Sequence, residues 1–191
     1  MANPKVPIGY KFSPSPEQSL EYLKGKILNQ ELPSDVIRTV DIYSCGDPHQ
    51  IPFSEFTHGA VNEWFFFTNK RKATRIQTTN GSWEEIGDQE ISDSDDETIG
   101  FMRILEFSYS NPEDAEKEKE WYIHEYSVNP ANFTADELAD DNVKEKISNF
   151  VLCKVVCEEE FPPCKPPTSS SSDDVADDEG EDNEVVDGAN S

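Results

Sequence analysis

Basic residues are scarce in this chain, and their scarcity limits what it can bind. The 191 residues include 16 Lys and Arg against 40 Asp and Glu, which gives a net charge of −24. Residues 1–81 hold nine basic and eight acidic residues, residues 82–156 hold six and twenty, and residues 157–191 hold one and twelve. An acidic surface repels phosphate, so the second half of the chain disfavours nonspecific nucleic-acid binding.

Cysteine is also scarce, and no metal site is expected. Cys153 and Cys157 are four residues apart, but no second pair or nearby His completes a zinc set. We interpret the four Cys as free thiols in a reducing compartment. No apolar run approaches the length of a membrane span, and residues 1–5 lack the apolar core of a signal peptide. We therefore expect a soluble, intracellular protein with no membrane contact.

Catalytic motifs are missing as well. The three histidines are His49, His58 and His124, and none lies in a nucleophile motif or a Gly-rich phosphate loop. His124 and Glu125 are neighbours in an expected strand, where neighbouring side chains point to opposite faces. The acidic run at 93–97 lacks the ligand spacing of an EF-hand. We predict that the protein is not an enzyme and needs no cofactor.

Aromatic residues, by contrast, are abundant and suit a β-rich core. The chain has three Trp, six Tyr and eleven Phe, each able to bury a large apolar area. Turns rather than regular helices separate the expected strands, which favours an antiparallel sheet. The expected strands lie at 63–68, 82–91, 99–109, 120–128 and 150–156, and residues 39–43 are expected to be extended.

Three helices are expected beside this sheet. The first begins at residues 15–18, which form a capping box with Pro at the first helical position, and its apolar face follows over 20–28. Residues 32–37 suggest a short second helix. Residues 134–148 suggest a third, since they open with another capping box.

The end of the chain has a different composition. Beyond Glu160, Pro pairs, a Ser run and an acidic run follow with almost nothing apolar. Such a segment cannot form a packed core. We predict one domain over residues 1–156 and a disordered acidic tail, rich in Pro and Ser, over residues 157–191.

The one dense basic run of the sequence lies at residues 70–75, KRKATR. Four positive charges in six residues suit contact with phosphate or a signal for nuclear import. An exposed, soluble hairpin loop would have the same composition. The run alone does not decide between these interpretations.

Five motifs occur in order along the chain. They are VPIGYKFSPSPEQ at 6–18 with Tyr22-Leu23 after it, DIY at 41–43 before a Pro-containing loop at 48–52, EWFFF at 63–67, WYIHEY at 121–126, and VLCK at 151–154. Together they resemble the plant NAC domain, which opens with LPPGFRFxPTDEEL and continues through DLY, EWYFF, WxMHEY and VLC(R/K). The resemblance covers about residues 6–156.

The resemblance implies a fold and a dimer. The expected fold class is α+β, mainly β: a twisted antiparallel sheet flanked by the N-terminal helix and short helices. The family's intersubunit Arg–Glu pair corresponds to Lys11 and Gln18, with Glu17 beside it, and Lys lacks the bidentate geometry of Arg. The positions expected at the dimer interface are Pro7, Gly9, Tyr10, Lys11, Phe12, Glu17 and Gln18.

The resemblance also implies sequence-specific binding of double-stranded DNA. In the family, a strand with the motif WKATGxDK enters the major groove, and basic residues beside it hold the phosphates. The positions expected to contact DNA are Lys70, Arg71, Lys72, Arg75, Trp83, Glu84 and Arg103.

This chain departs from the family at that strand. Trp83 and Gly87 keep their places, but the two Lys positions are Glu84 and Glu90. Three further positions differ: Glu85 replaces Ala, Ile86 replaces Thr and Gln89 replaces Asp. Loss of two Lys–phosphate contacts flattens the dependence of binding on log salt by about 1.8, at about 0.9 per contact.

Two hypotheses follow. In the first, the protein is a NAC-type DNA-binding transcription regulator of the plant nucleus, with weakened sequence-specific binding. In the second, it is a degenerate NAC-like interaction module that heterodimerises with NAC factors without contacting DNA. In both hypotheses the protein has NAC-domain proteins as its partners, in a homodimer or a heterodimer.

Overall fold

The computed structural model describes residues 10–33, 35–115 and 119–159. The dimer positions Pro7 and Gly9 lie outside this part of the chain, and so does the expected tail from residue 160 onward.

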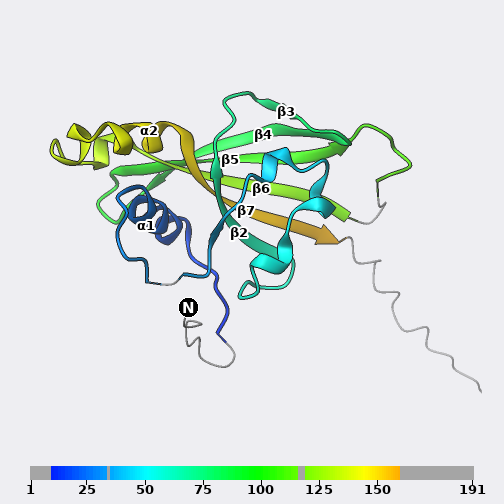
Figure 1. The fold of residues 1–191 in the computed structure, drawn as a ribbon, viewed down its shortest axis with the longest axis horizontal. Coiled ribbons are helices and arrows are strands. Elements are labelled where there is room, and N and C mark those ends of the chain that lie inside the picture. Colours follow the sequence, from blue (N-terminus) through cyan, green and yellow to red (C-terminus); the bar gives the residue numbers. More distant parts are fainter. Residues whose placement is uncertain (1–9, 34, 116–118, 160–191) are drawn as a thin grey trace, which may run out of the picture. The chain divides into compact units, whose positions relative to one another are not determined.

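The described residues are built on one seven-stranded sheet with the order β1-β2-β7-β6-β5-β4-β3 (Figure 1). Only β1 and β2 run parallel; all other neighbours are antiparallel. The α+β, mainly β class is therefore confirmed, with a mixed sheet rather than a purely antiparallel one. The strands are β1 (Arg38–Thr39), β2 (Glu63–Asn69), β3 (Arg75–Gln77), β4 (Gly81–Ser92), β5 (Thr98–Tyr109), β6 (Lys119–Val128) and β7 (Phe150–Glu159).

Helix α1 (Pro16–Ile27) covers one face of the sheet (Figure 1). It begins as the sequence predicts: the side chain of Ser15 accepts a hydrogen bond from the backbone of Gln18, and Gln18 returns one to Ser15. Its apolar face is buried on the sheet, and Gly100 of β5 permits the close approach. A Cβ at Gly100 would lie 2.6 Å from the methyl carbons of Leu20.

Residues 40–56 cover the opposite face with three short 3-10 helices: η1 (Ile42–Ser44), η2 (Pro48–Gln50) and η3 (Phe53–Glu55). Phe53 stacks on Trp64 of β2 and Trp121 of β6, with ring centroids 4.1 Å and 5.5 Å away. Side chains alternate between the faces of a strand, so Phe65 and Phe67 face α1 while Trp64 and Phe66 face this segment.

Two of the helix predictions were wrong in detail. Residues 32–37 form no helix where they are described, because the chain runs extended there to bury Val36 and Ile37 and to start β1. The capping box of Thr134 and Glu137 does form, at 2.9 and 3.2 Å. It leads only into the 3-10 turn η5 (Glu137–Ala139), and a second short turn, η4 (Pro130–Asn132), precedes it.

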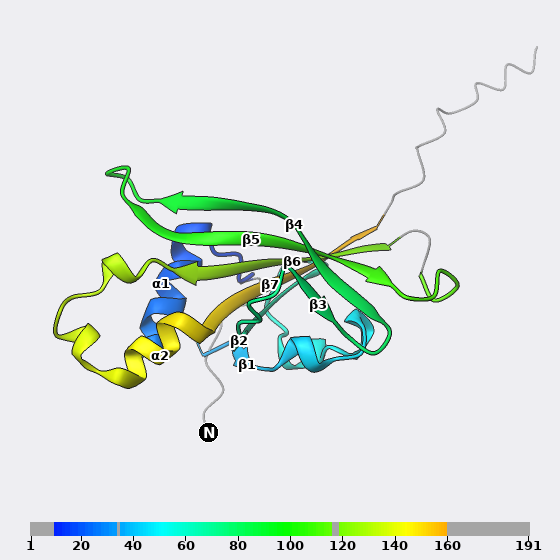
Figure 2. The same cartoon turned by 90° about the horizontal axis from the view of Figure 1, so that it is seen from above.

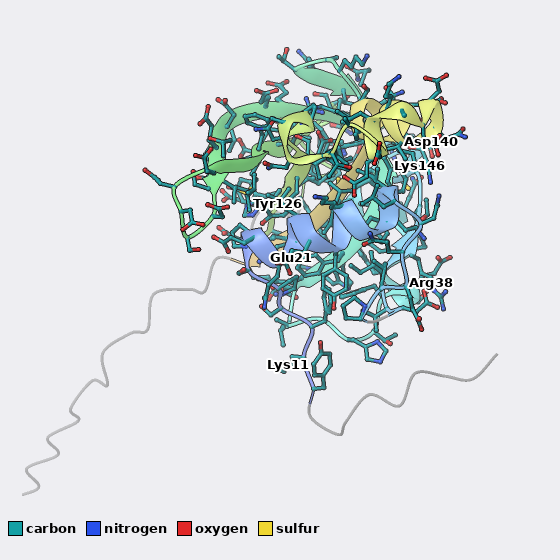
Figure 3. The ribbon with its side chains drawn as sticks, turned by 90° about the vertical axis from the view of Figure 1, so that its left-hand side faces the viewer. Lys11, Glu21, Arg38, Tyr126, Asp140 and Lys146 are labelled. Carbon is teal, nitrogen blue, oxygen red and sulfur yellow. The ribbon has the colours of Figure 1, made fainter. Side chains whose placement is uncertain are left out.

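Helix α2 (Asp141–Asn149) starts from its own cap, because the Asp140 side chain accepts a hydrogen bond from the backbone N–H of Asn142 at 2.8 Å. The ammonium of Lys146 then joins α2 to the end of α1 (Figure 3). It donates to the carbonyl of Ile27 at 3.4 Å and to the side chain of Asn29 at 2.7 Å. Neither α1 nor α2 is long and apolar enough to cross a lipid bilayer, which holds for every helix of the described residues.

Candidate nucleic-acid interface

The basic run forms a loop, here called the basic loop (residues 70–75), between β2 and β3. Its ends are fixed by backbone hydrogen bonds: the N–H of Lys70 donates to the carbonyl of Asn149 at 2.7 Å, and Thr74 accepts from Glu85 of β4 at 2.8 Å. The loop therefore lies against the start of β7 at one end and against β4 at the other.

Arg103 of β5 holds the middle of the basic loop. Its guanidinium donates to the carbonyl of Arg71 at 2.5 Å and to that of Ala73 at 3.1 Å. The same guanidinium donates to both oxygens of Glu125, at 2.7 and 3.2 Å, and to Glu85 at 3.4 Å. Its side chain is only 11% exposed. The charge of Arg103 is thus committed inside the protein, and its role is to position the loop.

Glu125 is the buried carboxylate that holds Arg103 in place. Its side chain is 1% exposed, and it accepts a hydrogen bond from the hydroxyl of Tyr43, which also lies 3.6 Å from the sulfur of Cys153. Burial, with the nearby Cys153 and Glu125, raises the pKa of Tyr43, so the hydroxyl stays a donor. Burial lowers the pKa of Arg103, but its hydrogen bond and ion pair with Glu125 outweigh this and the pKa is raised. A buried charge paired in this way is stable because each partner satisfies the other.

The remaining charges of the basic loop are not equally available. Arg71 pairs with Asp41 at 2.8 Å, and Arg75 pairs with Glu84, its cross-strand neighbour on β4, at 3.3 Å. Among the described residues, no carboxylate pairs with Lys70 or Lys72, and Lys72 is exposed. Within residues 10–33, 35–115 and 119–159, these two ammonium groups are therefore the side-chain charges of the loop that have no carboxylate partner.

Strand β4 presents a core residue and an acidic surface. Trp83 is 1% exposed and packs edge-to-face on Phe107 of β5, with ring centroids 5.0 Å apart. Its side chain therefore fixes the strand in the core rather than facing solvent. The register slips by one residue at Ile86, a β-bulge that leaves this side chain 55% exposed. Asp88 and Glu90 beyond it are exposed.

The structure brings most of the expected DNA positions together. The basic loop, Glu84 and Arg103 form one connected group through hydrogen bonds and ion pairs. Sequence reasoning missed the partners Tyr43, Glu85 and Glu125. The signal was present, because a carboxylate inside an otherwise aromatic strand is buried only when a cation satisfies it.

The expected dimer positions of the N-terminal segment differ in their exposure to solvent. Tyr10 and Lys11 are exposed, and Figure 3 shows Lys11 on the extended segment beside α1. Phe12 is 1% exposed: its N–H donates to the carbonyl of His58 at 2.6 Å, and its ring packs on Phe65. Phe12 is therefore a core residue that anchors the segment.

Glu17 and Gln18 both take part in the start of α1. The amide oxygen of Gln18 accepts from the backbone of Ser15 at 2.9 Å, so this side chain is committed to the cap. Glu17 accepts from the hydroxyl of Ser15 at 2.6 Å, and this hydrogen bond lowers the pKa of Glu17. Glu17 is exposed, and of the two it is the side chain that carries a charge toward solvent.

The interpretation of His124 as a strand residue agrees with its surroundings. Its side chain lies on the face opposite to Glu125, beside Lys154 of β7, its cross-strand neighbour. Burial, with the charge of Lys154, lowers its pKa. Within the described residues no three His, Cys, Asp or Glu side chains group as a metal site. Cys45 and Cys153 are free thiols.

Comparisons of the sequence with known proteins give relatives of this chain. A family model described as no apical meristem (NAM) protein matches residues 7–128. NAC domain-containing proteins 96 and 12 of Arabidopsis thaliana are 30% and 31% identical over 173 and 163 residues, which cover 84% and 79% of this chain. NAC domain-containing protein 54 of Oryza sativa subsp. japonica is 27% identical over 162 residues, 81% of this chain. The matches span 55%, 45% and 24% of these relatives' own lengths.

The fold is an α+β domain built mainly on one β-sheet, and the sequence matches give its family. The chain belongs to the NAC family, whose members are generally transcription factors.

Proposed function

We propose that this protein is a NAC-type transcription regulator that binds the DNA backbone weakly through the basic loop. The observation that carries the proposal is the pair Lys70 and Lys72, which have no carboxylate partner among the described residues. The loop that bears them is held in one conformation by Arg103. A fixed loop loses little conformational entropy when its lysines meet phosphates, which favours binding.

In this proposal the protein contacts DNA phosphates but recognises little of the base sequence. Base recognition needs hydrogen-bonding side chains directed into a groove. On β4 the exposed positions Asp88 and Glu90 are acidic, and they would face the negative potential of the duplex. We therefore expect little discrimination between a family-type site and scrambled DNA.

The number of contacts sets the expected salt dependence. Two free lysines give a slope of log affinity against log salt of about −1.8, at about 0.9 per contact. Glu84→Lys adds one lysine and also releases Arg75 from its ion pair at 3.3 Å. This substitution should steepen the slope by about 1.8, whereas Glu90→Lys, which frees no arginine, should steepen it by about 0.9.

The experiment is a fluorescence-anisotropy titration of a labelled duplex with the full chain at several salt concentrations. Lys70→Gln with Lys72→Gln should flatten the slope to near zero. Lys119→Gln, at the opposite end of the sheet, is the matched control and should leave the slope unchanged. Equal slopes for the wild type and the double variant would refute DNA contact through the loop.

A second function is favoured by the acidic residues of β4: a NAC-like module that heterodimerises with NAC factors and does not touch DNA. Tyr10, Lys11 and Glu17 are the exposed residues available for such a dimer among the described ones. In this case, adding the chain to a DNA-binding NAC protein should lower that protein's DNA binding, and the chain alone should show no salt-dependent binding. Charge reversal at Lys11 together with Glu17 should then weaken the heterodimer.

We further propose that the protein acts in the nucleus. Exposed basic residues of the basic loop would serve import, and the same double variant tests this. A fluorescent fusion carrying Lys70→Gln and Lys72→Gln should spread through the cell if the loop is the import signal.

A further inference from the structure

Strand β4 has an open edge beyond the point where β3 ends. β3 pairs only with residues 82–84 of β4, and Glu85 makes the last backbone hydrogen bond toward the basic loop. From Ile86 to Ser92, no strand of the described part of the chain lies on the outer side of β4. Figure 2 shows β4 along the margin of the sheet. Unpaired N–H and C=O groups on such an edge are a template for another strand.

The side chains along this edge have one sign of charge. Asp88 and Glu90 are exposed, and among the described residues no cation pairs with either. The loop that follows at 93–97 adds four more acids and no base. Two apolar side chains accompany them: Ile86 is 55% exposed, and Phe101, the cross-strand neighbour of Glu90, is 37% exposed.

We infer that the β4 edge, residues 86–92, binds a basic, extended segment of another protein as an added strand. Backbone hydrogen bonds from the edge would supply affinity, and the acidic side chains would select a basic partner. A second copy of this chain would bring Asp88 and Glu90 against the same residues, which is repulsive. Nucleic acid is disfavoured at this edge for the same reason.

The geometry specifies the sequence of the partner segment. Asp88 and Glu90 are two residues apart, so they lie on one face of the sheet together with Phe101. An added strand places every second side chain beside them. The matching segment therefore carries Lys or Arg at alternate positions, with β-branched residues between them.

The opposing interpretation is that the acids only protect the edge from self-association, as charged side chains do on many edge strands. Both interpretations predict that an acidic protein attracts cationic peptides in general. They differ in whether the peptide's backbone is paired with β4.

The experiment is a titration of the full chain with a labelled nine-residue peptide, Lys-Thr-Lys-Val-Lys-Thr-Lys-Val-Lys, followed by anisotropy. Two N-methylated forms carry methyl groups on the amides of every second residue, in one phase or the other. Only one phase places its amides toward β4, so one form should lose binding at least tenfold while the other stays within about twofold. A peptide of the same composition with its five lysines at consecutive positions should bind more weakly than the alternating one.

Variants of the protein test whether the acidic side chains of the β4 edge contribute to peptide binding. Asp88→Asn with Glu90→Gln should weaken binding of the alternating peptide about tenfold, since each facing charge pair is worth roughly two- to fivefold. Glu113→Gln with Asp114→Asn, in the loop between β5 and β6, removes two exposed acids elsewhere and should change binding by less than about twofold. Circular dichroism confirms that each variant is folded.

Hydrogen exchange locates the peptide. Binding should slow exchange of the amides in residues 86–92 and leave the amides of β7 unchanged. Equal binding of both N-methylated forms, or protection that spares residues 86–92, would overturn the inference. So would protection of this segment in the peptide-free protein that grows with protein concentration, since it would assign the edge to a second copy. None of these results depends on DNA binding by the basic loop.

Discussion

Replacing Tyr43 by Phe removes one buried hydroxyl and tests the network beneath the basic loop. The hydroxyl is a hydrogen-bond donor to Glu125, whose other partner is Arg103, at 2.7 and 3.2 Å. A hydrogen bond to a charged group stabilises a protein by about 1.5–3 kcal/mol. For a domain of this size, that corresponds to a fall in Tm of roughly 3–12 °C.

The assay is thermal and urea unfolding of the full chain, followed by circular dichroism and tryptophan fluorescence. Tyr122→Phe is the matched control, because its hydroxyl also donates to a carboxylate, that of Glu120 at 2.7 Å, but this pair is exposed. A surface substitution of this kind should change the free energy of unfolding by no more than about 0.5 kcal/mol.

A double-mutant cycle shows whether Tyr43 acts through Glu125. Glu125→Gln leaves Arg103 buried with only Glu85, at 3.4 Å, as a countercharge. Loss of the closer carboxylate of this buried pair should cost about 3–5 kcal/mol. The Tyr43→Phe and Glu125→Gln costs should not add, because the two groups are in contact, and the coupling should be about 0.5–3 kcal/mol.

The same variants report on the basic loop. Arg103 donates to the carbonyls of Arg71 and Ala73, so a less constrained guanidinium should let the loop open more often. Amide exchange over residues 70–75 should then be faster in Tyr43→Phe than in Tyr122→Phe. The reasoning is refuted if Tyr43→Phe costs less than about 0.5 kcal/mol, or if the exposed control costs as much.

Three further predictions concern the core and its edges. Gly100→Ala should destabilise the protein by about 1–3 kcal/mol, because its Cβ would lie 2.6 Å from Leu20, whereas Gly87→Ala, with nothing within 4 Å, should cost less than about 1 kcal/mol in urea unfolding. Ser15→Ala should cost about 1 kcal/mol by loss of the α1 cap, and an unchanged urea midpoint would contradict it. Burial above all raises the pKa of Tyr126 to about 12 from the 10 of an unfolded chain. The folded state therefore binds this proton more tightly, and its stabilising effect, present below pH 10, should be lost between pH 10 and 12. Over that range the wild type should lose about 2–3 kcal/mol more than Tyr126→Phe, and parallel pH profiles of the two proteins would contradict the assignment.

The strands and α1 were predictable because their signals are local. Aromatic and alternating runs at 63–68, 82–91 and 99–109 each form a strand, since such side chains fit a pleated, half-buried surface. The capping box at residues 15–18 sets the start of α1 within its own four residues. The fold class follows from the order of these elements.

The sequence-based predictions failed where contacts between residues distant in the sequence determine the structure. The capping box at Thr134 and Glu137 looks as good as the first one, yet it produces only a 3-10 turn. The helix that follows is placed by burial of Val143 and Ile147 and by the contact of Lys146 with the end of α1. Local propensity cannot anticipate such contacts.

For the candidate site, the sequence indicates which residues to consider but not which contacts they make with one another. Arg103 is next to Glu125 only because β5 and β6 pair in one register, which sets Arg103 opposite Glu125. That register is not readable from either strand alone. The hydrogen bonds of Arg103 to two carbonyls of the basic loop depend on the loop's path in three dimensions, which the sequence does not show.

The acidic residues of β4 are not equivalent. Glu84 forms an ion pair with Arg75, and Glu85 forms one with Arg103. Arginines of the neighbouring strands therefore largely cancel the negative charges of these two residues. Asp88 and Glu90 have no such partner in the part of the chain that the structure describes. If the basic loop contacts DNA as proposed, the first two would reduce phosphate contact chiefly by occupying arginines, whereas the second two set the negative potential of the open edge. The proposed phosphate contact therefore depends on the start of β4 and the inferred cation-selective edge on its end, so substitution of Glu84 should affect DNA binding and substitution of Glu90 should affect peptide binding more strongly.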